Sequence, residues 1–230
     1  YSMTQKLIQD RYQEVLDRIQ KHSPEGKAPQ LIAVSKTVGA DQIQALYDLG
    51  QRHFGENRYP ALLEKQAALA QTAPDIVWHF IGRVQTRQVK EFINQIDYLH
   101  ALDRFDLAKE IQKRADHPIK CFLQVNVSGE ESKTGYEPEQ VFAAIEQLAP
   151  YDKIEIVGLM TMAPADALEG ELHFFFKTLK HLQLLVQEAG YPHAPCSELS
   201  MGMSQDYSIA TEEGASFLRV GSALFAPEGY

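Results

Sequence analysis

Leu31-Ile32-Ala33-Val34-Ser35-Lys36 is an aliphatic run that ends in a lysine. A run of this length predicts a buried strand whose side chains alternate between two faces. Ile32, Val34 and Lys36 then share one face, so an amine follows two core residues. A lysine on a core face is costly unless it is paired, neutral or covalently used, and a neutral amine is a nucleophile toward carbonyl groups. The alternative is a lysine just past the strand end that reaches into solvent.

Strand-like runs of this kind alternate with amphipathic segments along the whole chain. Glycines at 50, 190 and 214 fall where helix C-caps are expected. Eight strands alternating with helices indicate parallel βα units, and eight is the number that closes a barrel. The predicted strands are 31–35, 52–54, 76–81, 96–100, 119–127, 154–160, 197–200 and 217–220, and the predicted helices between them are 41–50, 60–71, 86–95, 104–115, 138–148, 170–189 and 206–213.

A further amphipathic helix is predicted at 3–21, before the first strand, whereas few residues follow the last strand. We therefore expect an α/β fold, a single (β/α)8 TIM-type barrel over 3–230. The extra N-terminal helix would cover the seam between strands eight and one. Tyr1 and Ser2, which precede Met3, are interpreted as a remnant of expression. A doubly wound open sheet is the competing fold, but the G-x-G-x-x-G motif expected after its first strand is absent.

Composition excludes several classes of function. The 230 residues are 44% hydrophobic and 23% charged, as in ordinary globular proteins. A net charge of −9 argues against a general binder of nucleic acid or of anionic membranes. No apolar stretch approaches the roughly 20 residues that span a bilayer. Cys121, Cys196 and the eight histidines have no metal-like spacing, so we expect no metal, no disulfide and a cytoplasmic protein.

Unusual residues cluster where the strands of such a barrel would end, which is where barrel active sites lie. Small residues after strands seven and eight would let backbone N–H groups approach a phosphate, and a helix start after Ser204 adds a favourable dipole. Each residue also has a structural alternative: Ser204 as a helix cap, Arg219 in an ion pair, His79 in the core, Asn57 in a turn. The candidate site residues are Lys36, Asn57, His79, Ser200, Gly202, Ser204, Arg219, Gly221 and Ser222.

An amine, a phosphate cradle and a polar anchor between them suit pyridoxal 5′-phosphate (PLP). The chain moreover resembles the pyridoxal phosphate homeostasis proteins (YggS/PROSC type) over nearly its whole length. The motifs that carry this resemblance are Ala33-Val34-Ser35-Lys36, Phe54-Gly55-Glu56-Asn57, Trp78-His79-Phe80-Ile81-Gly82, Ser132-Lys133-Thr134-Gly135, Leu159-Met160-Thr161-Met162, Leu199-Ser200-Met201-Gly202-Met203-Ser204 and Arg219-Val220-Gly221-Ser222-Ala223.

The resemblance implies a barrel like the N-terminal domain of alanine racemase, with PLP in a Schiff base on Lys36. Ser200 and the Gly221-Ser222 turn would hold the phosphate, Arg219 would face the pyridine nitrogen, and Asn57 and His79 would line the pocket. The chain departs from the family pattern at Arg58-Tyr59-Pro60-Ala61 and at Arg83-Val84-Gln85-Thr86-Arg87-Gln88. These departures concern the rim of the pocket rather than the lysine or phosphate positions.

Two functions fit this resemblance. The first is a PLP carrier that maintains vitamin B6 homeostasis and supplies apo-enzymes. The second is a small PLP-dependent amino-acid racemase. Alanine racemase has a second, β-rich domain and takes a catalytic tyrosine from its partner subunit, and the sequence offers no counterpart of either. We therefore expect a monomeric carrier and not an enzyme. A third alternative is a barrel that binds another phosphorylated ligand without a covalent bond.

Overall fold

Eight parallel strands pair in chain order and close into a barrel in the computed structural model, which describes residues 4–131 and 134–226. β1 is bonded to both β2 and β8, and this pairing confirms the predicted barrel and excludes the open sheet. Ser132 and Lys133 of the family motif lie outside the described residues. The strands are β1 (Gln30–Val34), β2 (His53–Glu56), β3 (Val77–Phe80), β4 (Tyr98–Leu102), β5 (Ile119–Gln124), β6 (Ile154–Met160), β7 (Glu198–Ser200) and β8 (Phe217–Val220).

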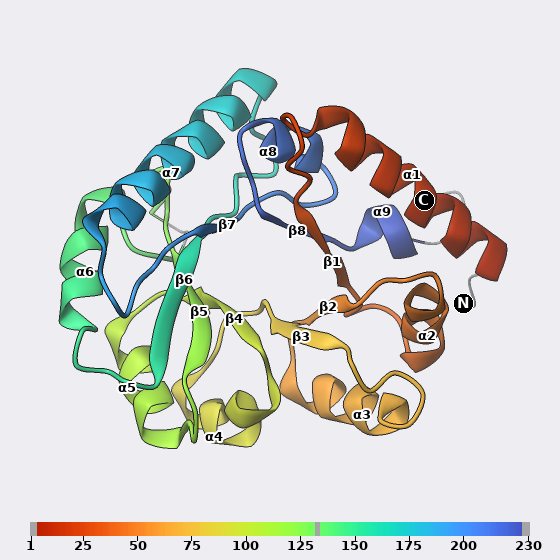
Figure 1. Cartoon of the computed structure of the whole chain (residues 1–230), viewed down its shortest axis with the longest axis horizontal. Helices are drawn as coiled ribbons and strands as arrows, with labels where there is room; N and C mark the ends of the chain where they lie inside the picture. The colour runs from red at the N-terminus through yellow and green to blue at the C-terminus, as the bar shows by residue number, and fades with distance from the viewer. Residues whose placement is uncertain (1–3, 132–133, 227–230) are drawn as a thin grey trace.

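Helices surround the ring of strands (Figure 1). The predicted helix at 86–95 is instead a four-residue α-helix between two 3₁₀ turns, since Phe92 leaves the helical region with φ −143°. A single turn after β8 was not predicted. The helices are α1 (Gln5–His22), α2 (Ala40–Asp48), α3 (Tyr59–Leu69), α4 (Val89–Phe92), α5 (Phe105–Arg114), α6 (Val141–Gln147), α7 (Glu169–Ala189), α8 (Tyr207–Glu212) and α9 (Ser222–Phe225).

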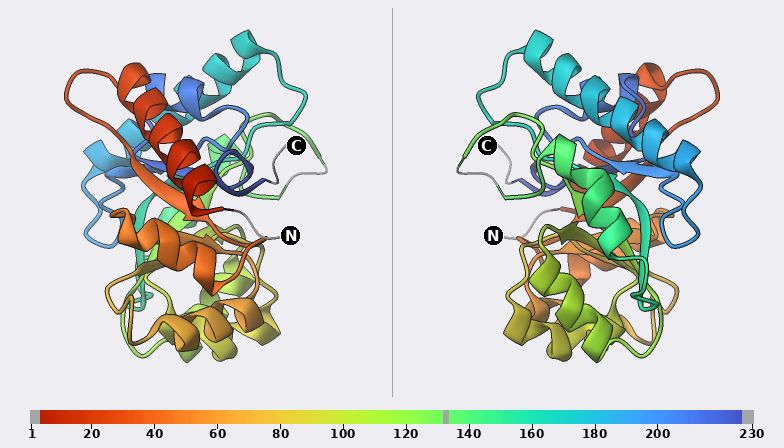
Figure 2. Two further views of the ribbon diagram at one scale, coloured as in Figure 1. Left: turned by 90° about the vertical axis from the view of Figure 1, so that its right-hand side faces the viewer. Right: turned by 90° about the vertical axis from the view of Figure 1, so that its left-hand side faces the viewer.

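The first helix covers the seam between β8 and β1, as predicted. The side chain of Thr4 caps α1 by accepting from the backbone N–H of Leu7 at 3.2 Å. Ile8, Val15 and Ile19 recur at helical spacing and are buried. α1 packs against α2, α8 and α9, and Figure 2 shows it lying across the outside of the barrel. The seam between β8 and β1 is thus covered by the N-terminal helix.

Apolar residues form two separate packed regions. The larger one fills the space between strands and helices, while a small cluster inside the barrel contains Ile32, Phe122 and Phe217. Ile32 therefore faces inward, and the position of Phe217 shows that alternate residues of β8 do so too. The position of Ile32 confirms the predicted face of β1, and the two placements together direct Lys36 and Arg219 to the carboxyl end of the interior.

Three glycines end helices as the sequence predicted. Gly50, Gly190 and Gly214 have φ values of +111°, +71° and +98°, which residues with a Cβ rarely adopt. Within 4–131 and 134–226, no helix is long and apolar enough to cross a membrane. In the same segments, no group of three histidine, cysteine or acidic side chains is placed to hold a metal ion.

Candidate functional site

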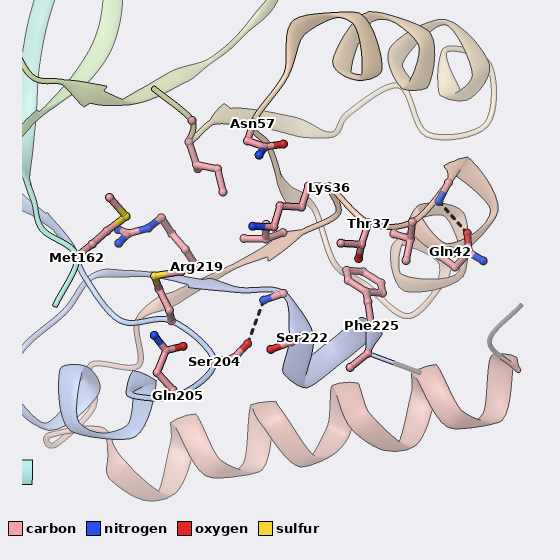
Figure 3. Close-up of a pocket in the computed structure, with 18 of the residues that line it drawn as sticks. Lys36, Thr37, Gln42, Asn57, Met162, Ser204, Gln205, Arg219, Ser222 and Phe225 are labelled. Atoms are coloured by element: carbon pink, nitrogen blue, oxygen red, sulfur yellow. Dashed lines mark hydrogen bonds between the residues drawn. The ribbon is translucent and has the colours of Figure 1, made fainter. Parts of the chain in front are cut away.

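A cavity of about 790 Å³ opens at the carboxyl end of the barrel. It lies where ligand sites of this fold are found and has a volume typical of small-molecule pockets. In the view of Figure 3, Lys36 extends into its centre, Asn57 lies above, and Ser204 and Ser222 lie below. Six of the nine predicted site residues line it: Lys36, Asn57, Ser204, Arg219, Gly221 and Ser222.

Lys36 stands two residues beyond the end of β1, on the inward-facing row. Ser35 beside it is fully buried, but Lys36 itself is exposed. The burial expected for this lysine is therefore wrong. Its amine reaches into an open cavity, where a carbonyl compound from solvent can approach it directly.

An ion pair with a buried carboxylate anchors the backbone just before Lys36. Glu56 is fully buried, and its carboxylate accepts hydrogen bonds from Lys65 Nζ at 2.9 and 3.0 Å and from the Ser35 hydroxyl. Lys65 Nζ also donates to the Ser35 carbonyl oxygen at 2.7 Å. These bonds fix the peptide from which Lys36 projects. Sequence reasoning missed this role of Glu56, although it lies inside a family motif.

Replacing Glu56 by alanine is expected to lower the free energy of unfolding by about 3–5 kcal/mol, because the Lys65 side chain is only 11% exposed and its charge would lose its partner. Urea unfolding followed by circular dichroism measures this loss. The double variant Glu56→Ala/Lys65→Met is the control, and it should recover most of the stability. Equal losses in the single and the double variant would contradict the assigned ion pair.

Ser204 joins the loop after β7 to the turn after β8. Its Oγ accepts from the backbone N–H groups of Gly221 at 3.3 Å and Ala223 at 3.0 Å. The alternative that Ser204 caps α8 is wrong, because Asp206 holds the N-cap position and accepts from the Met203 N–H at 2.7 Å. Two backbone donors already converge on an oxygen at this turn, so the turn can present donors to an anion.

Arg219 is a buried cation that faces the cavity. Its side chain donates to Ser200 Oγ and to the Thr161 carbonyl oxygen at 2.9 Å, and the residue is only 3% exposed. Among the described residues no carboxylate lies within 4.0 Å of it, so the structural ion pair considered as an alternative is wrong. Burial lowers the pKa of Arg219 to about 10, partly offset by the charge of Asp206. This guanidinium can therefore serve an acceptor on a ligand.

His79, Ser200 and Gly202 do not line the cavity, in contrast to the other predicted site residues. Ser200 and His79 are fully buried inside the barrel, behind Arg219. Gly202 has φ +102°, and a Cβ there would lie 2.7 Å from the Cβ of Ala210. This glycine is therefore required by the chain's turn and its packing against α8.

Several lining residues were not singled out from the sequence, among them Thr37, Gln42, Met162 and Phe225. Gly82 also lines the cavity, and a Cβ there would lie 2.9 Å from the Cβ of Asn57. Its place in a family motif was the available signal. Arg83, one of the departures from the family pattern, stands on the rim and pairs with Asp103 at 3.7 Å.

The buried imidazoles of His79 and His100 predict a fold that loses stability in acid. Burial holds the pKa of each well below its usual value of 6.5, so the unfolded chain binds protons there that the folded chain does not. Their stabilisation is full above pH 6.5 and is lost as the pH falls below it, with a limiting slope of about 1.4 kcal/mol per pH unit for each histidine. Urea unfolding at pH 7 and pH 5.5 tests this expectation. Equal stability at both values would contradict it.

Comparison with known proteins identifies the family. A family model described as "Alanine racemase, N-terminal domain" matches residues 9–228. The pyridoxal phosphate homeostasis protein of Aquifex aeolicus is 37% identical, over 96% of this chain and 98% of the relative. The chain belongs to the pyridoxal phosphate homeostasis protein family. The human member of that name is 35% identical, over 98% of this chain and 86% of its own.

Solved structures agree with this assignment. PipY of Synechococcus elongatus is 33% identical, with 95% of this chain and all of that chain covered, and the TM-score is 0.84 without PLP and 0.81 for the structure described with PLP bound. An alanine racemase from Corynebacterium glutamicum is 15% identical, with a TM-score of 0.73 over 97% of this chain and 62% of that chain. The racemase shares the barrel, and at this identity the likeness concerns the fold alone.

Proposed function

We propose that this protein binds PLP as a Schiff base on Lys36 and supplies it to apo-enzymes, as part of vitamin B6 homeostasis. The observation that carries the proposal is that one cavity holds both an accessible amine, Lys36, and a buried guanidinium, Arg219, with no carboxylate within 4.0 Å of it among the described residues. The names of the relatives and the PLP described in PipY support it.

The residues around the cavity suit the parts of PLP. The turn at Gly221 and Ser222 would bind the phosphate through the Ser222 N–H and through the Ser204 hydroxyl, which accepts from the Gly221 N–H and keeps its own hydrogen to donate. Arg219 would donate to the pyridine nitrogen, and Asn57 would contact the ring or its substituents. In forming the bond, the Lys36 nitrogen replaces the aldehyde oxygen, which leaves as water. In delivery, the lysine amine of a recipient enzyme would replace the Lys36 nitrogen on the aldehyde carbon, and the free Lys36 amine would be restored.

A carrier fits the cavity better than a racemase does. Racemisation requires an acid or base on each face of the substrate carbon. Among the described residues that line the cavity, none is a histidine, tyrosine, cysteine, aspartate or glutamate. Lys36 is the one lysine among these lining residues, and it is also the proposed anchor. We infer that the protein holds PLP without catalysing turnover, and that it does so as a monomer.

Borohydride reduction of the PLP-loaded protein, followed by peptide mass mapping, tests the attachment. We expect a phosphopyridoxyl group on the peptide that contains Lys36. An unmodified Lys36 peptide would overturn the covalent proposal and favour a barrel for another phosphorylated ligand.

Two further assays separate carrier from enzyme. The loaded protein should activate an apo-enzyme even when a phosphatase removes free PLP, whereas an equal amount of free PLP should fail under these conditions. Loss of optical activity from L-alanine and other amino acids should not exceed the rate with free PLP. A faster loss would favour the racemase. Light scattering after size exclusion tests the monomer.

A further inference from the structure

A chain of hydrogen bonds crosses the interior of the barrel and ends at Arg219. His53 Nδ1 lies 2.9 Å from His79 Nε2, and His79 Nδ1 lies 2.8 Å from His100 Nε2. His100 Nδ1 lies 2.9 Å from Ser200 Oγ, which accepts from Arg219. The four residues come from β2, β3, β4 and β7. The chain thus runs from the amino-terminal rim of the barrel to the cavity at the other end.

Aromatic rings shield this chain from water. His79 stacks on Tyr98 with ring centroids 4.6 Å apart, and His100 stacks on Phe122 at 4.4 Å. His79 and His100 are fully buried, whereas His53 is half-buried and lines a separate surface hollow with Tyr12 and Arg52. Protons can therefore exchange with solvent at the rim or at the cavity, but not in between.

Arg219 sets the direction of every bond in the chain. Arginine only donates, so Ser200 Oγ accepts from it and keeps its own hydroxyl hydrogen. Among the described residues, His100 Nδ1 is the acceptor within reach of that hydrogen. His100 must then carry its proton on Nε2 and donate to His79, and His79 in turn donates from Nε2 to His53. Each imidazole is neutral and holds one defined tautomer.

We propose that His53, His79, His100 and Ser200 form a directional proton relay that links the amino-terminal rim of the barrel to Arg219. Protonation of His53 reverses all of its bonds. Each shared proton moves one position toward the rim, and Ser200 passes its hydroxyl proton to His100. In the same concerted movement Ser200 receives a proton from Arg219 and Arg219 receives one from hydronium in the cavity, so that the guanidinium keeps its charge throughout. The chain gains one proton in total, and the charge rests on His53.

Reversal of these hydrogen bonds changes the contacts of Arg219. Ser200 then accepts from both His100 and Arg219, and its hydroxyl hydrogen loses the acceptor it had. A buried unsatisfied donor is unfavourable, so the contact that positions the guanidinium weakens. His53, His79, His100 and Ser200 are therefore positioning residues, because they act on a ligand only through Arg219. The effect on bound PLP rests on the proposed function, whereas the relay itself does not.

The charged groups around the relay place its transition in the acid range. Burial lowers the pKa of His53, partly offset by the charge of Asp97. Lys120 stands over the Tyr98 ring at 5.2 Å, and Arg52 lines the same hollow as His53. At the cavity end, Asp206 acts on Arg219. His53 is consequently neutral at pH 7, and the relay should reverse below pH 6.5.

Nitrogen-15 NMR of histidine-labelled protein without PLP tests the relay. Long-range proton–nitrogen spectra distinguish Nδ1–H from Nε2–H tautomers. At pH 7 we expect His79 and His100 both as the Nε2–H tautomer. Below pH 6.5 both should change to Nδ1–H with the same midpoint as the protonation of His53. A mixture of tautomers at pH 7, or tautomers that stay fixed while His53 titrates, would overturn the proposal.

The variant His53→Gln removes the titrating group at the amino-terminal rim. Its side-chain oxygen can still accept from His79 but does not titrate, so the tautomer change at His79 and His100 should be lost. The exposed His117→Gln variant is the matched control and should keep it. If His53→Gln does not fold, the wild-type spectra alone decide. In the wild type, PLP affinity should change below pH 6.5, and this change should be absent in His53→Gln. Failure to bind PLP at all would count against the proposed function, and the NMR result would then still test the relay.

Discussion

Replacing Lys36 by alanine is expected to abolish reducible attachment of PLP and to weaken its retention by at least about 100-fold, roughly 2.7 kcal/mol. The reason is that the proposed bond is made by this amine, which the cavity places opposite Arg219. The measurement is the absorbance of PLP that stays with the protein after gel filtration, with peptide mapping after borohydride reduction.

The same substitution should leave the fold unchanged, since Lys36 is exposed and beyond the end of β1. Lys177→Ala, at an exposed position on α7, is the matched control and should retain PLP fully. A Lys36→Ala protein that still gives a labelled peptide would show that another lysine holds the cofactor. A protein that no longer melts cooperatively would show instead that Lys36 has a structural role.

Gly158→Ala is expected to destabilise the barrel by at least about 3 kcal/mol, the upper end of the cost of overpacking. Gly158 lies in β6, and a Cβ there would overlap the Glu198 carbonyl group of β7 and come within 2.9 Å of the Phe122 ring. Relief would require β6 and β7 to separate. For a chain of this length the melting temperature should fall by about 6–12 °C.

Gly170→Ala is the control for Gly158→Ala. Gly170 lies in the first turn of α7, and no heavy atom lies within 4 Å of the position of its Cβ. Alanine there removes backbone freedom from the unfolded chain and should stabilise the protein by about 0.5–1 kcal/mol. If both variants have the same stability, the close approach of β6 and β7 at Gly158 does not exist in solution.

The barrel was predictable because its strands are apolar runs separated by helix-length segments. The structure confirms all eight strands, and the inward row that begins at Ile32 follows from simple alternation. The helical elements that were not predicted correctly are short. The turn at Ser222–Phe225 and the divided helix around Phe92 span too few residues to show a helical period.

The site was predictable where one residue type is unusual for its position. Lys36 and Arg219 are charges at the ends of apolar strands, and both line the cavity. Which side chains would contact each other was not predictable in this way. Glu56 and Lys65 are nine residues apart, and their contact depends on how α3 docks beside β2.

The histidine relay escaped prediction for a similar reason. His53, His79 and His100 each lie in a predicted strand, but each taken singly looks like a core histidine. Their contacts exist because β2, β3 and β4 are neighbours, and Ser200 joins them only across the interior of the closed ring. Three histidines on consecutive strands were the signal that could have pointed to it.

The placement of α1 has a consequence for the topology of the chain. α1 stands beside α8, α9 and α2, at the seam where most barrels of this type carry the helix that follows strand eight. In space, therefore, the molecule has the standard order of strands and helices, and only the position of the chain ends differs. A circular permutant that starts at Gln30 and carries Gln5–His22 behind Phe225 would keep α1 beside α2, α8 and α9. The elements that α1 packs against, and not its position in the sequence, thus make it the helix that covers the seam.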